Sequence, residues 1–169
     1  MPRRVPVAPV AVLAAAALAA PSAASAAVLD ASCTSPSVGE IGQPGNNRGA
    51  QTFTAQNTGA LTRAQVEINK IGSPGDWILS INAVDGSGAP TNTVLGATTI
   101  SDSSVPNAVG TLTADFAHPA AVTAGQQYAL AFTRPASDTL RIGYSIVNAC
   151  PGGAFFSFSQ ADPFDYVCA

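Results

Sequence analysis

The chain has 169 residues, with seven Lys and Arg side chains against ten Asp and Glu, so its formal net charge at pH 7 is −3. An acidic chain with so few cations is a poor partner for nucleic acid or for anionic lipid, because both are bound through clustered Lys and Arg. Its length is enough for one domain with a hydrophobic core and short for two.

The first 26 residues predict a signal peptide that is cleaved on export. Arg3 and Arg4 precede a nearly uncharged run of Ala, Val and Leu, and Ala24-Ser25-Ala26 then supplies the small residues that a signal peptidase reads. An uncleaved membrane anchor is the alternative, since the stretch up to Val28 is long enough to span a bilayer. Prolines inside this Ala-rich segment argue against a stable span and favour cleavage near Ala26.

Lipidation of Cys33 is a second alternative to simple secretion. Asp30 stands where a Leu is expected three residues before a lipidated cysteine, so we expect no lipid anchor. Without residues 1–26, five basic side chains remain against the ten acidic ones, which gives a net charge of −5. That value is ordinary for a soluble secreted domain.

The segment from residue 32 to residue 49 is predicted to be a long surface loop. Its sequence, SCTSPSVGEIGQPGNNRG, is dominated by Gly, Pro, Ser and Asn, the residues that form turns and loops. We find no internal repeat and no low-complexity linker elsewhere in the chain.

Apolar and polar residues alternate in five later segments, as in strands that bury one face. Turn-forming residues separate these segments, and no window after residue 27 keeps a helical period, so we expect one antiparallel sandwich or barrel over residues 27–169. The alternating apolar positions are Ala64-Val66-Ile68, Trp77-Leu79-Ile81, Leu112-Ala114-Phe116, Tyr128-Leu130-Phe132 and Leu140-Ile142-Tyr144-Ile146.

The heptapeptide VTAGQQY, residues 122–128, favours a sandwich over an open sheet. Its turn delivers Tyr128 into the start of a strand. This resembles a tyrosine corner, in which the hydroxyl bonds back to the backbone where the chain crosses between two sheets. An inward-facing tyrosine at a strand edge is an alternative that the sequence leaves open.

The order of motifs resembles that of a known group of domains. VLDASC is followed by GAQTFTAQNTGALTRAQVEI and GDWILSINAVDGSGAP, and then by FAHPAAVTAGQQYALAF, PGGAFF and DPFDYV. Over residues 28–167 this set resembles bacterial secreted jelly-roll domains, including the choice-of-anchor domains. The resemblance implies a jelly-roll β-sandwich that is often accessory to larger surface or secreted proteins. It implies no reaction and no catalytic or ligand residue.

Side chains suited to catalysis or metal binding are sparse. His118, the only histidine, precedes Pro119 in a predicted turn, and a general base needs an orienting partner that this pattern does not supply. Asp85-Gly86-Ser87-Gly88 would need remote carboxylates such as Asp76 or Asp102 to hold calcium, so a hairpin loop is favoured there. We therefore expect no enzyme, no cofactor and no metal.

Cys33, Cys150 and Cys168 all belong to the exported part, where thiols oxidise. Three cysteines allow one intramolecular bridge. Cys33–Cys150 would close a loop of most of the chain, which stabilises by about 4 kcal/mol in the chain-entropy model. Cys150–Cys168 is the competing pair, because a hairpin that turns near Ala161 would bring the two opposite each other. Geometry rather than spacing decides between them.

The segment NACPGGAFFSFSQADPF, residues 148–164, holds a cluster of phenylalanines. Phe155 and Phe156, with Tyr144 or Trp77, could form an aromatic platform that stacks on sugar rings. Sugar-binding faces favour Trp and Tyr, whose polar tips also bond hydroxyls. Adjacent residues of a strand point to opposite faces, so packing in the core or at a sheet edge is the alternative, with one phenylalanine facing outward.

The sequence therefore favours a secreted, non-catalytic β-sandwich module that binds an extracellular glycan, a polymer or a cell-surface protein. A structural or matrix component of the cell surface, without a small ligand, is the alternative, and a hydrolytic enzyme is a distant third. None of these interpretations includes nucleic acid as a partner. None includes a membrane span once the signal peptide is removed.

Overall fold

The computed structural model describes residues 28–32, 38–41, 48–73, 75–133, 140–143 and 153–158. For residues 38–41, 140–143, 155, 157 and 158 it describes the backbone alone. The predicted signal peptide, the three cysteines and Tyr144 lie outside these ranges.

The described chain is all-β, as the alternating pattern predicts. It forms nine strands and one 3-10 turn, and every strand pairing is antiparallel. The elements are β1 (Val38–Ile41), β2 (Arg48–Thr54), β3 (Gly59–Lys70), β4 (Trp77–Val84), β5 (Pro90–Ile100), the turn η1 (Asp102–Ser104), β6 (Gly110–Val122), β7 (Gln127–Thr133), β8 (Leu140–Gly143) and β9 (Phe155–Phe158).

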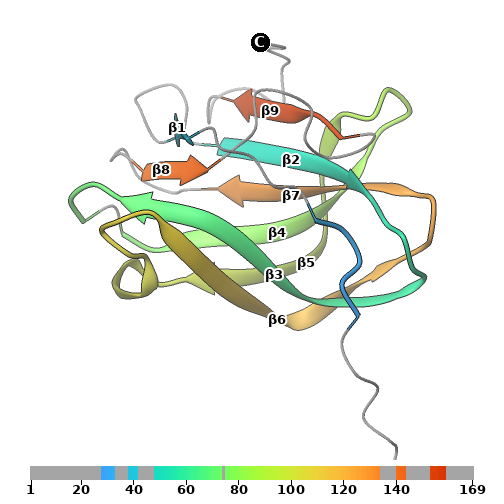
Figure 1. Cartoon of the computed structure of the whole chain (residues 1–169). Coiled ribbons are helices and arrows are strands. Elements are labelled where there is room, and N and C mark those ends of the chain that lie inside the picture. The colour runs from blue at the N-terminus through green and yellow to red at the C-terminus, as the bar shows by residue number, and fades with distance from the viewer. Residues whose placement is uncertain are drawn as a thin grey trace, which may run out of the picture.

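The strands make two sheets that face each other as a sandwich (Figure 1). One sheet has the order β1-β8-β3-β6, and the other has the order β5-β4-β7-β2-β9. In the view of Figure 1, β3 and β6 of the four-stranded sheet lie in front. The antiparallel sandwich that the sequence predicts is confirmed.

The main core lies between the sheets and is built from the predicted apolar positions. Leu79 and Ile81 of β4 are each 1% exposed, and burial of such a side chain stabilises by about 1.5–3 kcal/mol. Ser80 and Asn82, which alternate with these positions, point to the outer face of the sheet. The buried members of the core are Phe53, Val66, Ile68, Trp77, Leu79, Ile81, Ile100, Val105, Leu112, Ala114, Phe116, Ala120 and Phe132.

The prediction of one uninterrupted loop over residues 32–49 is wrong. Residues Val38–Ile41 form β1, and β2 begins at Arg48. The backbone of β1 pairs with β8, with Val38 opposite Gly143 and Ile41 opposite Leu140. Pairing with a strand about a hundred residues away gives this glycine-rich stretch its conformation, and no local pattern carries that information.

Tyr128 confirms the tyrosine corner. The chain leaves β6 in one sheet, turns at Gly125 with φ of 79°, and enters β7 in the other. At this crossing the Tyr128 hydroxyl accepts a hydrogen bond from the backbone N–H of Thr123, at 2.9 Å. The Tyr128 ring also lies 6.1 Å from that of Phe53. The corner therefore fixes how the two sheets are joined.

Strands β5 and β6 approach each other where they close one side of the sandwich. A Cβ atom on Gly96 would lie only 2.7 Å from the carbonyl oxygen of His118, so a side chain at this position would force the strands apart.

His118 itself is exposed and lies within β6 rather than in the predicted turn. None of the described segments is a helix with the length and hydrophobicity that crossing a bilayer requires.

Candidate functional site

Two residues of the predicted aromatic platform, Trp77 and Phe156, lie in different packing clusters. Trp77 is 2% exposed and belongs to the core between the sheets. Phe156 is 7% exposed and belongs to a second cluster, on the opposite face of the five-stranded sheet. Phe155 pairs through its backbone with Gln51, and Tyr144 lies outside the described residues. Trp77 and Phe156 therefore contribute to packing on two different faces.

The predicted disulfide partners Cys33, Cys150 and Cys168 also lie outside the described residues, so the pairing stays a prediction. The described Gly153 and Ala154, which follow the Cys150-Pro151-Gly152 stretch, run directly into β9. There the N–H of Ala154 donates to Oγ1 of Thr52, at 2.7 Å. The segment that follows Cys150 is thus attached to β2 at Ala154.

Asp85 organises the hairpin loop between β4 and β5, as the sequence predicts. Its Oδ1 accepts hydrogen bonds from the N–H of Ser87 at 2.8 Å, from the Ser87 hydroxyl at 2.6 Å and from the N–H of Ala89 at 3.0 Å. Gly88 takes a φ of 85°, which a residue with a side chain rarely adopts. This carboxylate stabilises the turn.

Asp76 and Asp102 lie at the other end of β4 from Asp85, where they tie loops together. Lys70 Nζ is 2.9 Å from Oδ2 of Asp102 and 2.7 Å from its carbonyl oxygen. The other carboxylate oxygen accepts from the N–H of Gly75 at 3.3 Å, and the N–H of Asp102 donates to Oδ1 of Asp76 at 3.0 Å. Within the described ranges, no three His, Cys, Asp or Glu side chains gather as a metal site would need.

A continuous set of exposed hydrogen-bonding side chains lies on the outer face of the four-stranded sheet. We call it the polar face. All its members are exposed, while the residues between them along both strands point into the core. It consists of Arg63, Gln65 and Glu67 on β3 and of Thr111, Thr113 and Asp115 on β6.

The strand register pairs these side chains across β3 and β6. Arg63 stands opposite Asp115, and its Nε donates to Oδ1 of that carboxylate at 2.6 Å. Gln65 stands opposite Thr113, and its Nε2 donates to Oγ1 at 3.2 Å. Glu67 stands opposite Thr111. Three cross-strand pairs therefore follow one another along the sheet.

The electrostatics of the polar face are those of an exposed ion pair. The side chains of Arg63 and Asp115 are 57% and 68% exposed. The hydrogen bond from Arg63, and then its charge, lower the pKa of Asp115, and the same contact raises the pKa of Arg63. Both groups are charged at neutral pH and cancel each other, so Glu67 leaves the face with one net negative charge.

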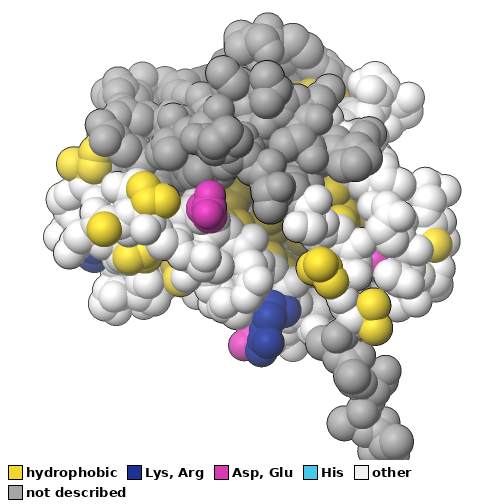
Figure 2. All heavy atoms as spheres, in the orientation of Figure 1, with side chains coloured by type: hydrophobic (Ala, Val, Ile, Leu, Met, Phe, Trp, Pro, Cys, Tyr) yellow, Lys and Arg dark blue, Asp and Glu magenta, His cyan; other side chains and the backbone are white. Residues whose placement is uncertain are grey.

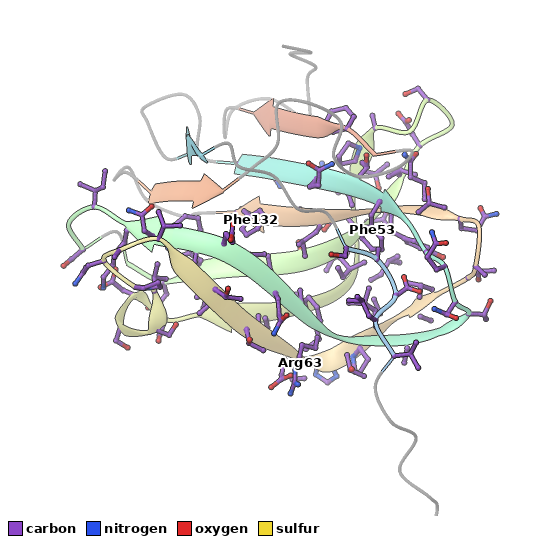
Figure 3. The ribbon with its side chains drawn as sticks, in the orientation of Figure 1. Phe53, Arg63 and Phe132 are labelled. Carbon is purple, nitrogen blue, oxygen red and sulfur yellow. The ribbon has the colours of Figure 1, made fainter. Side chains whose placement is uncertain are left out.

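Figures 2 and 3 show the polar face from outside. Arg63, labelled in Figure 3, points away from the sheets, whereas Phe53 and Phe132 come from β2 and β7 behind. Figure 2, in the same orientation, shows dark blue and magenta side chains together at that place.

Asn69 continues the β3 row beyond Glu67. It stands opposite Arg141 of β8, and the residue is 9% exposed. Its Oδ1 is buried and accepts no hydrogen bond, a loss of about 1–3 kcal/mol for a buried polar atom. The row therefore ends in an acceptor that has no donor.

The outer face of the five-stranded sheet is built differently. We call it the alanine face, and all its members are at most 4% exposed. Phe156 packs against its alanines. Asn82 accepts a hydrogen bond from the Ser80 hydroxyl at 2.7 Å and donates one to the carbonyl oxygen of Thr91 at 2.8 Å. The alanine face comprises Ala50 and Thr52 on β2, Ala129 and Ala131 on β7, and Ser80 and Asn82 on β4.

At the margin of this face, Arg48 of β2 donates from Nη2 to Oδ1 of Asn92, at 3.3 Å. Burial lowers the pKa of the Arg48 guanidinium. The members of the alanine face are buried and those of the polar face are exposed, so of these two sets of side chains the polar face is the one that a ligand can reach. The sequence pattern predicts that residues 63–67 and 111–115 point outward, but not that β3 and β6 are neighbours.

The comparisons add no relative from which a function could be transferred. A scan against protein-family models gives no match to this chain, and no curated protein matches it significantly.

Proposed function

We propose that this protein is a secreted, non-catalytic β-sandwich module that binds an extracellular glycan or related polymer through its polar face. The observation that carries the proposal is the exposed set of three cross-strand pairs, Arg63–Asp115, Gln65–Thr113 and Glu67–Thr111. Donors and acceptors for hydroxyl groups stand side by side on it, and the core beneath holds both strands in place.

Export is the part of the proposal that rests on residues 1–26. The basic, apolar and small-residue order supports cleavage near Ala26, so the secreted form begins near Ala27 or Val28. The resemblance to choice-of-anchor domains supports the same location and an accessory role. N-terminal sequencing of the secreted protein tests cleavage, and recovery of intact residues 1–26 in the membrane fraction contradicts it.

A structural component of the cell surface, without a small ligand, is the second candidate. It is favoured by the fact that Gln65 bonds Thr113 and Arg63 bonds Asp115, so these side chains already satisfy each other in part. A surface-protein partner is a third possibility, and it depends on segments other than the polar face, which has few apolar side chains.

Co-sedimentation with insoluble polysaccharides and isolated cell walls tests the proposal. The protein comprising residues 27–169, with its cysteines oxidised, is incubated with each material, and the free fraction is measured. We expect depletion by at least one glycan. If every glycan and wall preparation leaves the protein in solution, the module does not bind glycan and the structural role is the better account.

A further inference from the structure

We infer that the ligand of the polar face is a neutral, hydroxyl-rich polysaccharide chain that lies along β3, with the Gln65–Thr113 pair at the centre of the contact. This inference rests on the proposed function and narrows it from extracellular polymers in general to one chemical class. Four properties of the polar face point to it: its charge, its lack of large apolar side chains, its hydrogen-bonding groups and the spacing of its pairs.

The charge of the polar face disfavours an anionic polymer. Arg63 is the one cation there, and its charge is cancelled by Asp115 at 2.6 Å. Glu67 has no cation opposite it, since its partner in the register is Thr111. The chain without residues 1–26 also carries five basic against ten acidic side chains. A uronate or phosphate polymer would therefore find no unpaired cation among the six side chains of the polar face, and the net charge of the chain would repel it.

The composition of the polar face disfavours a protein partner. Protein interfaces draw most of their affinity from buried aromatic, large apolar and Arg side chains at the centre. The described large hydrophobic residues that are exposed lie elsewhere, and none is at an outward position of residues 63–67 or 111–115. They are Val28, Leu29, Ile71, Ile78, Val94, Leu95 and Val109.

The donors and acceptors of the polar face match hydroxyl groups. Gln65 is exposed and uses Nε2 to bond Thr113, which leaves its Oε1 as a further acceptor. Arg63 uses Nε for Asp115, and its guanidinium has further N–H donors. A hydroxyl both donates and accepts, so it can bond either kind of group.

The direction of the ligand follows from the strand geometry. Successive outward residues of a strand are about 6.5 Å apart, so the three pairs form a straight row along β3 and β6. An extended polymer that follows this row meets all three pairs, whereas a small sugar meets only one. We therefore expect affinity to rise with chain length.

Affinity electrophoresis tests the inference with soluble polymers. The protein of residues 27–169 is run through native gels that contain a neutral β-glucan, a neutral galactomannan or anionic polygalacturonate. The test variant is the double substitution Gln65→Ala and Thr113→Val, with Gln65→Ala alone as a second variant if the double one does not fold. The matched control is Thr99→Val, an exposed position on β5 of the other sheet.

We expect retardation by a neutral polymer and none by polygalacturonate. Loss of two hydrogen-bonding side chains should weaken binding about tenfold. Binding should change little when the salt concentration is raised, because a neutral polymer has no charges that pair with charges of the protein. The Thr99→Val control should bind like the unmodified protein.

Other outcomes overturn the inference, and they separate its failure from that of the proposed function. If a neutral polymer is bound equally well by the double variant, the polar face is not the site, although the module still binds glycan. If polygalacturonate binds more tightly than the neutral polymers, the ligand class is wrong. If none of the polymers, insoluble glycans or walls is bound, the proposed function fails as well.

Discussion

The two outer faces of this sandwich differ in chemistry, although both belong to antiparallel sheets that share one core. The polar face, on β3 and β6, carries charged, amide and hydroxyl side chains that are all exposed. The alanine face, on β2, β4 and β7, carries small side chains that are at most 4% exposed. An antiparallel sheet commonly leaves one face in water, and the polar face of the four-stranded sheet does so, whereas the members of the alanine face are buried.

The contrast shows which of these side chains are exposed to solvent and which are buried. Side chains of the alanine face bond to each other and to nearby backbone, as Ser80 does with Asn82 and Thr52 with Ala154. Bonds of the polar face join only neighbouring strands and leave further donors and acceptors in solvent. Substitutions on the alanine face should therefore change stability, and substitutions on the polar face should change binding.

The largest effect is expected for Phe156→Ala. Phe156 is 7% exposed and packs against Ala50, Ala129 and Ala131, so truncation leaves a cavity. We expect the free energy of unfolding to fall by about 3–5 kcal/mol, measured by urea denaturation. Thr113→Ala on the polar face is the control, with a change within about 0.5 kcal/mol. Equal effects of the two substitutions would contradict the distinction between the faces.

A small-to-large change at Ala129 should come next. Ala129 is 0% exposed, and the added atoms of a leucine have no room without movement of its neighbours. We expect Ala129→Leu to destabilise by up to about 3 kcal/mol in the same assay. Ala117→Leu, at an exposed outward position of β6, is the matched control and should unfold at an unchanged urea concentration. A tolerated leucine at position 129 would mean that this face is open.

Removal of one buried amide should have a smaller effect. Asn82→Ala takes away the acceptor of the Ser80 hydroxyl and the donor to the carbonyl of Thr91. Because both groups would be left without a partner, we expect a loss of about 1–2 kcal/mol. Gln65→Ala removes one exposed bond, to Thr113, and should leave the unfolding midpoint unchanged. Thermal and urea unfolding of both variants measure the two changes in stability. The prediction is wrong if Gln65→Ala destabilises the protein as much as Asn82→Ala.

The smallest effect concerns the exposed ion pair. Arg63 lowers the pKa of Asp115 in the folded protein, so the pair stabilises at neutral pH, and this contribution disappears as the pH falls through that lowered pKa. Arg63→Gln should raise the pKa of Asp115 toward the ordinary value of a carboxyl, and it should lower stability at pH 7 only slightly because both side chains are exposed. Carboxyl-carbon NMR titration measures the shift, and an unchanged Asp115 titration would show that the contact does not persist in solution.

Much of the fold could be predicted because its signal is local. The alternation in Ala64-Val66-Ile68 and in Leu112-Ala114-Phe116 identifies β3 and β6 and the side of each that faces the core. Tyr128, placed directly after a glycine turn, identifies the crossing between sheets. Each of these patterns depends on residues that are close in the chain.

Features that depend on distant pairing could not be predicted. β5 shows no regular alternation of apolar and polar residues. The polar Asn92 and the apolar Val94 are both exposed, in the part of β5 where its register with β4 shifts. The polar face exists because β3 pairs with β6, more than forty residues away. The burial of Trp77 and Phe156 on opposite faces of one sheet likewise follows from the topology.

Paramagnetic broadening of methyl signals by a soluble relaxation agent tests the central claim most directly, since it reports which outer face the solvent reaches. The account predicts strong broadening for the methyl groups of Thr111 and Thr113. It predicts that the methyl groups of Ala50, Ala129 and Ala131 are as well protected as those of Leu79 in the core. Broadening of Ala129 and Ala131 to the same degree as Thr113 would contradict the account, because both faces would then be open.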